Sequence, residues 1–264
     1  MLLQRLRRSR LRATPFLSVP ALGFFRLNAH QRILLRDLLT VASIGVGLVA
    51  INITAHFTTA ASWFLTMPAG VLVLVGIAKV LGLSWHDLGL SQRTLRKGLI
   101  YGGAAAASVA TLVGLGLVLP TTREFFLNDA YSSMRTALLA AFILIPLQTV
   151  IPEELAFRGA LHGSLARLGG ARAVFIGGSV LFGLWHVASS LNLTASNSGL
   201  TALLGSGTVA QWAGVGLAVV ATSVAGAGFT WLRHHTGSVI APIALHWALN
   251  AVGALAAAAA WQFA

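Results

Sequence analysis

The chain has 264 residues, of which 56% are hydrophobic and 9% charged, and its mean hydropathy is +0.82. These values exclude a soluble globular domain and indicate a protein surrounded by lipid. The net charge is +12, and the absence of cysteine excludes disulfides, a thiolate nucleophile and cysteine-ligated metal sites. Any metal would therefore need histidine and carboxylate ligands.

The N-terminal segment, residues 1–36, is a basic arm with eight arginines between Arg5 and Arg36 and no acid among them. Nucleic acid could bind such a segment, but the arm directly precedes a long apolar run, where anionic lipid headgroups explain the charge more simply. We therefore expect membrane lipids and no nucleic acid as partners. A secretory signal is not favoured, whereas an organelle transit peptide stays open. The preference for arginine over lysine, sixteen to two, favours a bacterial membrane.

Seven apolar stretches are long enough to span a bilayer, which takes about 20 residues of helix. The fourth continues past two glutamates to Leu168, and a break at a proline within it would give an eighth span. We therefore predict an all-α, polytopic transmembrane helical bundle of about seven to eight spans. The predicted spans are Leu38–His56, Trp63–Leu81, Gly98–Leu119, Thr136–Pro152, Ala173–Ser190, Val209–Leu232 and Ser238–Ala260.

Loops rich in basic residues alternate along the chain with polar loops that are poor in them. By the positive-inside rule, this alternation places the N-terminus in the cytoplasm and the C-terminus outside. We predict a cytoplasmic arm over residues 1–36, N-terminal transmembrane helices over 37–134, and a transmembrane core over 135–264. The basic residues that support this organisation, besides the arm, are Arg93, Arg96, Lys97, Arg167, Arg172 and Arg233.

Two of the six acids, Glu153 and Glu154, stand side by side within the fourth apolar stretch. An ionisable group inside a membrane costs at least about 2.5–3.5 kcal/mol, so it needs a partner or a function. Arg158 lies four residues after Glu154 on the same helix face, so we predict that they form an ion pair. Glu153 then points about 100° away, where an apolar setting and a like charge raise its affinity for a proton and suit a general base. For this pair alone, a purely structural bridge explains the sequence equally well.

Two further polar pairs lie in later spans. His186 follows Phe182 by four residues and Asn250 follows His246 by four, so each pair shares one face of an α-helix. Each histidine alone is better explained by a hydrogen bond to a neighbouring helix. Together with the glutamates and the arginine, however, they form a polar set in spans otherwise almost free of ionisable groups. The remaining histidines of the membrane region are interpreted as background: His56, His162, His234 and His235.

This set supplies what the hydrolysis of a peptide bond requires: a carboxylate to take a proton from water, an imidazole to pass one on, and donors for the oxyanion. Glu153, His186 and His246 could also hold a divalent metal such as zinc. Neither HExxH nor HxxEH occurs, so the usual metalloprotease helix is absent. The chain has no GxSxG and no paired membrane aspartates, which argues against serine and aspartyl chemistry.

Three motifs in this order resemble the CPBP family, which comprises CAAX proteases and bacteriocin-processing enzymes and is also called the Abi family. They are EExxxR at Glu153–Arg158, FxxxH at Phe182–His186 and HxxxN at His246–Asn250. Each motif is weak by itself, and the three in sequence are specific. The resemblance covers the chain from about Arg135 to the C-terminus, and a less specific likeness begins at Asp87.

The resemblance implies an all-helical intramembrane endopeptidase whose active-site cavity opens within the membrane. It implies Glu153 as the base that activates water, with Glu154 and Arg158 positioning the site. The family is usually described as metalloproteases, although a glutamate-activated water without metal is equally consistent with these residues. The activating and oxyanion-stabilising groups implied are His186, His246 and Asn250.

The expected substrate is a peptide or the membrane-proximal tail of a protein, with or without a lipid. A non-catalytic immunity or scaffold protein of the same fold is the alternative, because binding can use the same groups without turnover. A proton-coupled transporter would also carry intramembrane Glu, His and Arg. The N-terminal half has no counterpart of the three motifs, so the repeats typical of transporters are missing and transport is the weakest reading.

Overall fold

The computed structural model describes residues 28–195 and 198–263 of the chain. Every regular element within this part is helical, and none of its residues forms a strand. Five helices in it are long and apolar enough to cross a membrane, and a shorter apolar helix covers Phe64–Val80. The predicted all-α transmembrane helical bundle is therefore confirmed.

The N-terminal half consists of long helices that begin and end where local sequence dictates. Asn28 caps α1 through a capping box, in which its side chain accepts from the Gln31 amide while the Gln31 side chain accepts from the Asn28 amide. Because α1 begins at Ala29, the predicted basic arm ends in helix, and the rest of the arm lies outside the described residues. The elements here are α1 (Ala29–Phe57), α2 (Ala60–Val80), α3 (Gln92–Val118), α4 (Pro120–Arg123), η1 (Glu124–Phe126) and η2 (Asp129–Tyr131).

The C-terminal half begins with a helical stretch, Met134–Trp185, that is too long for a single crossing. Gly170, at φ 62° and ψ −155°, breaks it and lets the chain turn back. The chain therefore turns between the fourth and fifth predicted spans. The helix continues through Pro146 and Pro152, so the eighth span that a break at a proline would give is not formed. The stretch comprises α5 (Met134–Leu139), η3 (Ala140–Val150), α6 (Ile151–Glu154), η4 (Leu155–Leu161), α7 (His162–Arg172), η5 (Ala173–Gly177) and α8 (Gly178–Trp185).

The remaining elements follow the predicted spans closely. The exception is one short helix, Ser198–Leu204, which lies in the loop between the fifth and sixth predicted spans. α10 ends at Thr236 and is capped by Gly237, whose φ of 71° suits glycine. The turn at Gly170 divides the long stretch Met134–Trp185 into two segments, and α2 adds one more to the other long apolar helices. The described chain therefore contains the seven predicted apolar segments. The elements are η6 (Ala188–Ser190), α9 (Ser198–Leu204), α10 (Thr208–Thr236), α11 (Ile240–Trp247), η7 (Ala248–Val252) and α12 (Gly253–Ala260).

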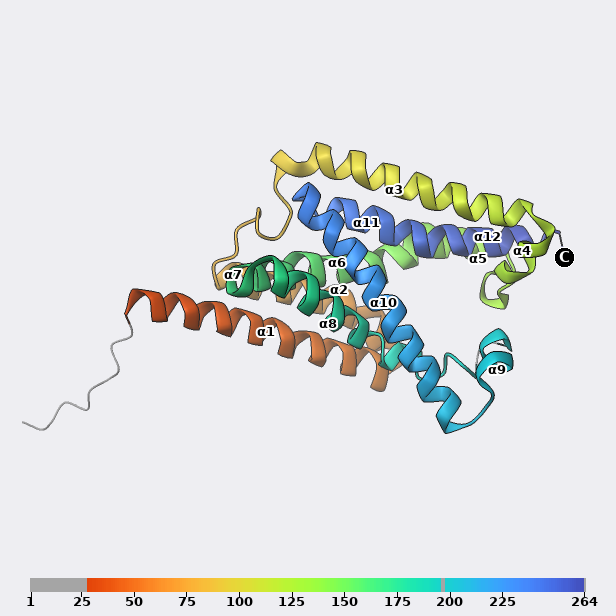
Figure 1. The fold of residues 1–264 in the computed structure, drawn as a ribbon, viewed down its shortest axis with the longest axis horizontal. Coiled ribbons are helices and arrows are strands. Elements are labelled where there is room, and N and C mark those ends of the chain that lie inside the picture. The colour runs from red at the N-terminus through yellow and green to blue at the C-terminus, as the bar shows by residue number, and fades with distance from the viewer. Residues whose placement is uncertain (1–27, 196–197, 264) are drawn as a thin grey trace, which may run out of the picture.

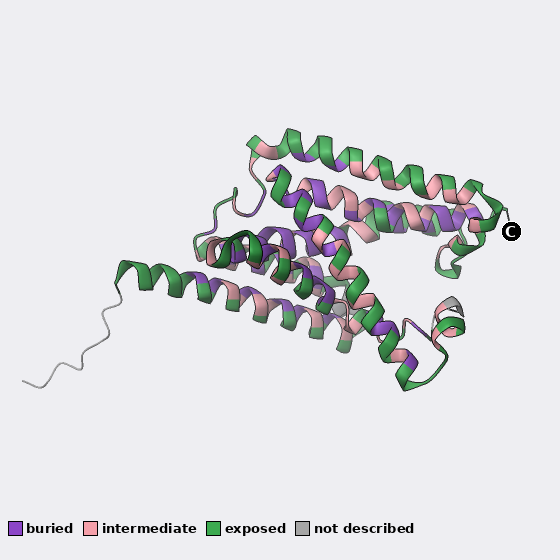
Figure 2. Ribbon diagram, viewed as in Figure 1, coloured by how far each residue is buried: buried purple, intermediate pink, exposed green. Residues whose placement is uncertain are grey.

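The helices form a bundle whose middle is occupied by the segment around α6 (Figure 1). α3 packs along α11, α1 packs on α2, and α10 crosses the bundle obliquely against α8. Buried residues line the faces where these helices meet, whereas the outward faces are exposed (Figure 2). Residues of the N-terminal half thereby enclose the segment that carries the two glutamates.

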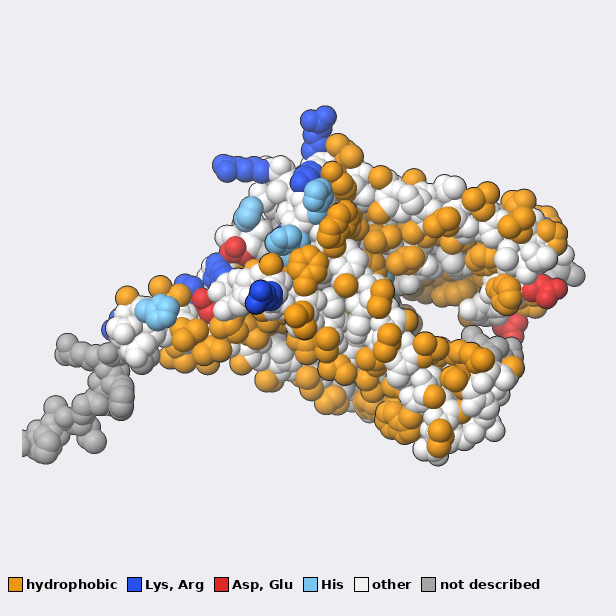
Figure 3. Space-filling view, in the orientation of Figure 1, with side chains coloured by type: hydrophobic (Ala, Val, Ile, Leu, Met, Phe, Trp, Pro, Cys, Tyr) orange, Lys and Arg blue, Asp and Glu red, His pale blue; other side chains and the backbone are white. Residues whose placement is uncertain are grey.

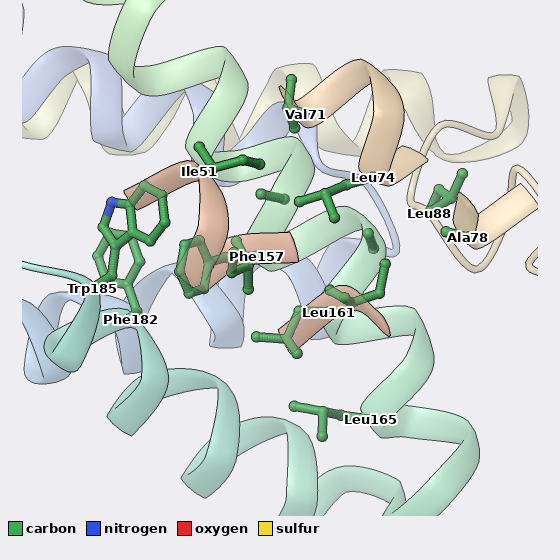
Figure 4. Packing of buried hydrophobic residues seen from close by; sticks show 14 of the residues in the cluster. Ile51, Val71, Leu74, Ala78, Leu88, Phe157, Leu161, Leu165, Phe182 and Trp185 are labelled. Carbon is green, nitrogen blue, oxygen red and sulfur yellow. The ribbon is translucent and has the colours of Figure 1, made fainter. Parts of the chain in front are cut away.

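The buried core joins α1 and α2 to the segment from η4 to α8 (Figure 4). Phe157 packs edge-on against Phe182 and Trp185, with ring centroids 5.1 and 5.5 Å apart. Many large apolar side chains nevertheless remain exposed on the outside, including Val46 at 70% and Leu72 at 69%. Such a surface is unfavourable in water and suits contact with lipid acyl chains (Figure 3).

Lys, Arg and His side chains gather at the end of the bundle where α3 begins (Figure 3). The loop between α2 and α3 reaches this end and is held by Asp87. Its carboxylate accepts hydrogen bonds from the Ser84 amide at 2.7 Å and hydroxyl at 2.8 Å, and pairs with Arg167 at 2.7 Å. Burial by itself would raise the pKa of Asp87, but the two Ser84 hydrogen bonds and the Arg167 charge together hold this pKa below its ordinary value.

The lowered pKa of Asp87 predicts how stability depends on pH. The contribution of the ionised carboxylate is fully present above its unfolded-state pKa of 3.8 and is lost as the pH falls through the lower folded-state value. Asp87→Asn should therefore lower the free energy of unfolding by about 1 kcal/mol at neutral pH. Thermal unfolding in detergent should show the stability difference between this variant and the unaltered chain becoming smaller as the pH falls below 3.8, the ordinary pKa of Asp87. A difference that does not change with pH would contradict the lowered pKa of Asp87.

Close approach between α8 and α10 predicts a second effect. A Cβ added to Gly183 would overlap the Ser223 hydroxyl and lie 2.6 Å from the Val219 carbonyl oxygen, whereas one added to Gly178 would meet nothing within 4 Å. Gly183→Ala should reduce the free energy of unfolding by about 1–3 kcal/mol. Gly178→Ala, on the same helix, is the matched control and should not be destabilised when both are compared by thermal unfolding.

Candidate active site

The backbone around the two glutamates is π-helical on both sides. η3 precedes α6 and η4 follows it, and the Ile151 amide bonds to the carbonyl of Pro146, five residues back. Pro146 and Pro152 lack the N–H that a regular α-helical ladder needs, which favours such wider turns. The single α-helical turn of α6 therefore presents Glu153 and Glu154 from an irregular stretch of backbone.

Glu154 holds two partners at once. Its Oε1 accepts hydrogen bonds from Arg158 Nη1 at 3.0 Å and from His246 Nδ1 at 2.8 Å. Glu154 is 0% exposed and Arg158 is 1% exposed, so this is a fully buried ion pair. The predicted Glu154–Arg158 pair is confirmed. The contact with His246 brings in α11, which lies 92 residues further along the chain, and it fixes the imidazole with Nε2 directed elsewhere.

Arg158 is also surrounded by aromatic rings. Its guanidinium carbon lies 4.0 Å from the ring centroid of Phe182 and 4.8 Å from that of Phe229, and Nη2 donates to the Gly226 carbonyl at 3.2 Å. The ring of His246 stacks on Phe229 with centroids 4.8 Å apart. The phenylalanine of the FxxxH motif thus has a physical role, because its face stabilises the buried cation.

Glu153 points to a different environment. Its Oε1 accepts a hydrogen bond from Trp185 Nε1 at 3.2 Å, while its Oε2 is buried without a partner among the described residues. The side chain borders a cavity of about 200 Å³. The cavity is lined by Ala55, His56, Met67, Gln148, Thr149, Glu153, Trp185, His186 and Ser189.

His186 borders the same cavity as Glu153. Its Nδ1 lies 2.8 Å from the Phe182 carbonyl oxygen, which can only accept, so Nδ1 carries the proton. Nε2 of the neutral ring then keeps a lone pair that can accept a proton. The structure therefore brings together a carboxylate oxygen without a partner and an imidazole with a free acceptor around one cavity, as the sequence predicts for Glu153 and His186.

Asn250 lies apart from this cavity. It is exposed and borders a neighbouring cavity of about 540 Å³ formed with η1, η2 and α12, and Thr149 lines both spaces. His246 is buried whereas Asn250 is not, although the predicted α-helical spacing places them on one face. The reason lies in the backbone, because η7 is π-helical from Ala248 onward and changes the rotation per residue.

Two residues of the Glu153 cavity escaped the sequence analysis. His56 was interpreted as background near the end of a span, but it lines the cavity, with Nδ1 bonded to the Asn52 carbonyl at 3.0 Å. Only tertiary packing places it there, through the hydrogen bond from Asn52 Nδ2 to the Trp185 carbonyl at 2.9 Å. Trp185 could have been suspected from sequence, because a tryptophan next to a site histidine needs a partner for its indole N–H.

Residues 135–252 match the model of a protein family described as type II CAAX prenyl endopeptidase Rce1-like. This segment is therefore similar to the CAAX protease family. The matched segment contains all six predicted site residues, from Glu153 to Asn250, and excludes His56. No curated protein and no solved structure matches the chain.

The likeness of this segment to the family, together with the apolar helices, points to an integral membrane protein. A metal is implied by the usual description of these proteases, and the predicted ligands were Glu153, His186 and His246. The donor set does not fit a three-ligand site: no three His, Asp or Glu side chains of the described residues gather closely enough to hold one ion. His246 is instead bound to Glu154 through Nδ1.

The buried ion pair predicts a large loss of stability when one partner is removed. Arg158→Ala leaves the Glu154 charge buried with only His246 as a partner, so the free energy of unfolding should fall by about 3–5 kcal/mol. The double variant Glu154→Gln/Arg158→Met removes both charges and should lose less than Arg158→Ala alone. Thermal unfolding and yield of folded protein in detergent measure both, and a stable Arg158→Ala protein would contradict the pairing argument.

Proposed function

We propose that the chain is an intramembrane endopeptidase in which Glu153 activates a water molecule for attack on a peptide bond. The observation that carries this proposal is the buried Oε2 of Glu153, which has no partner in the described part of the chain and belongs to a side chain at the edge of a cavity. A buried carboxylate oxygen is costly when unpaired, so its retention favours a functional partner such as water.

The proposed reaction uses groups of this chain alone. Glu153 Oε2 takes a proton from water as the water oxygen bonds to the carbonyl carbon of the substrate, and the carbonyl oxygen becomes an oxyanion. His186, which lines the cavity with Glu153, is the proposed group that stabilises the oxyanion and assists proton transfer. His246 and Asn250 do not line this cavity, so a direct role for them would need the substrate to extend beyond it. The proton held by Glu153 then passes to the leaving nitrogen as the C–N bond breaks.

The proposed substrate is a peptide or a protein tail held close to the membrane. Support comes from the apolar surface around the site and from the family description, which names a prenyl endopeptidase. A scaffold that only binds a peptide would use the same cavity, but it gains nothing from a carboxylate oxygen left without a partner. A peptidase therefore accounts for the unpartnered oxygen of Glu153 better than a peptide-binding scaffold does.

The orientation in the membrane is part of the proposal. The basic side chains at the end of the bundle where α3 begins (Figure 3) would face the cytoplasm by the positive-inside rule. α1 also begins near this end (Figure 1), so the proposed orientation has the start of α1 on the cytoplasmic side. The opposite end of the bundle, which carries α9 (Figure 1), would then face the other side of the membrane.

Replacing the proposed base tests the assignment directly. Glu153→Gln should reduce the cleavage rate by about 10²–10⁴-fold, because an amide cannot take the proton from water. Folding should be retained, since the amide oxygen can still accept the Trp185 hydrogen bond. The measurement is cleavage of short apolar and lipidated peptides by the detergent-purified protein.

The matched control for this experiment is Glu124→Gln, an exposed acid on η1, which should cleave at the rate of the unaltered chain. Full activity in a folded Glu153→Gln protein would contradict the assignment of Glu153 as the base. Cleavage by neither the unaltered chain nor the variant, over the whole peptide set, would favour the scaffold.

The arrangement of donors also predicts the response to metal removal. With no group of three ligating side chains in the described residues, a chelator such as EDTA should leave the cleavage rate within about twofold of the untreated rate. Rates before and after chelation, and after addition of zinc, provide the measurement. Loss of activity on chelation that zinc restores would place a metal in the reaction.

A further inference from the structure

A further cavity, lined by charged and histidine side chains, lies at the basic end of the bundle and shares no lining residue with the cavity around Glu153. Its volume is about 380 Å³. The loop before α3, the helix α7 and the end of α10 form its walls. The lining residues are His86, Asp87, His162, Gly163, Ala166, Arg167, Arg233, His234 and Gly237.

The charges around this cavity are unbalanced. Arg233 is 5% exposed and donates to three backbone carbonyls, those of Arg158 at 3.0 Å, Asp87 at 2.8 Å and His86 at 3.3 Å, but to no carboxylate. Arg167 pairs with Asp87. Among the described residues, the cavity is therefore lined by two guanidinium groups but only one carboxylate, which is paired with Arg167, and burying the excess positive charge is unfavourable without an anion.

The histidines of the cavity strengthen this conclusion. His162 is 8% exposed, and its Nδ1 is buried with no hydrogen-bond partner among the described residues. The ring of His234 lies 6.5 Å from it, centroid to centroid, and lines the same space. A buried polar group of this kind requires an explanation, and an acceptor inside the cavity provides one.

We propose that this cavity binds a phosphate-bearing anion, supplied either as the headgroup of an anionic lipid or as soluble phosphate. Guanidinium groups match the oxygens of phosphate in geometry and charge, and imidazole N–H groups add further donors. A cation does not fit, because no three ligating side chains of the described residues gather there. The basic end of the bundle also lies where anionic headgroups concentrate.

The cavity contacts the candidate active site at one point. Arg233 Nε donates to the carbonyl of Arg158, whose side chain pairs with Glu154. An anion held beside Arg233 would therefore stabilise the η4 backbone through the hydrogen bond that Arg233 donates to the Arg158 carbonyl. Binding itself needs no catalysis, so its test is independent of the proposed peptidase activity.

The experiment measures thermal unfolding of the full chain in dodecyl maltoside as a probe is added. One arm compares dioleoyl phosphatidylglycerol with dioleoyl phosphatidylcholine in mixed micelles, and the other compares sodium phosphate with sodium chloride at equal ionic strength. Binding to the folded state raises the midpoint in a saturable manner. Phosphatidylglycerol, phosphate or both should do so, whereas phosphatidylcholine and chloride should not.

Two pairs of variants locate the effect. His234→Ala and Arg167→Gln should weaken binding of the effective probe by about tenfold, the usual effect of losing a hydrogen bond to a charged group. Their controls are His235→Ala, whose ring stacks on Trp231 outside the cavity, and Arg172→Gln, an exposed cation at the same end. Both controls should bind as the unaltered chain does.

Each outcome decides one question. A response to the lipid alone identifies a headgroup site, a response to phosphate alone identifies a soluble ligand, and a response to both shows that the phosphate group itself is recognised. No saturable response to either probe would overturn the proposal, as would equal losses in test and control variants. If Arg167→Gln does not fold, the histidine pair decides the result.

Discussion

The buried pair of Glu154 and Arg158 is the constraint on which the C-terminal half depends. Two charges inside a bundle that faces lipid are tolerated only when their hydrogen bonds are satisfied. Glu154 therefore reaches His246 on α11, while Arg158 reaches the Gly226 carbonyl on α10 and the ring of Phe182 on α8. Satisfying one ion pair thus fixes three helices around α6, and the rest of the site takes its position from them.

The same constraint explains why two adjacent glutamates differ so strongly. Glu154 turns towards the cation and is fully occupied, whereas Glu153, one residue earlier, turns towards a cavity and keeps one oxygen without a partner. Neighbouring positions on a helix are about 100° apart, so identical side chains can reach opposite environments. A structural acid and a reactive acid can be built in this way from a single turn.

Much of this arrangement could be predicted from the sequence, because the information is local. The apolar spans follow from the length of a bilayer, and the Glu154–Arg158 pair follows from a spacing of four residues. The reversal at Gly170, the bond from His246 to Glu154 and the place of His56 in the cavity depend on packing between distant segments. Short sequence motifs carry no information on such contacts. In addition, the π-helical turns near Asn250 change the angle between successive residues, so the α-helical spacing of four no longer predicts which residues share a face.

The cavity around Glu153 is walled on one side by Ala55, His56 and Met67, which all lie outside the segment that defines the family. The acidic and imidazole groups of the three motifs come from one half of the chain, and part of the wall of the cavity comes from the other. Changes in α1 or α2 would thus reshape the space next to Glu153 and leave every motif intact. In this architecture, the shape of the cavity can vary while the polar groups around it stay the same.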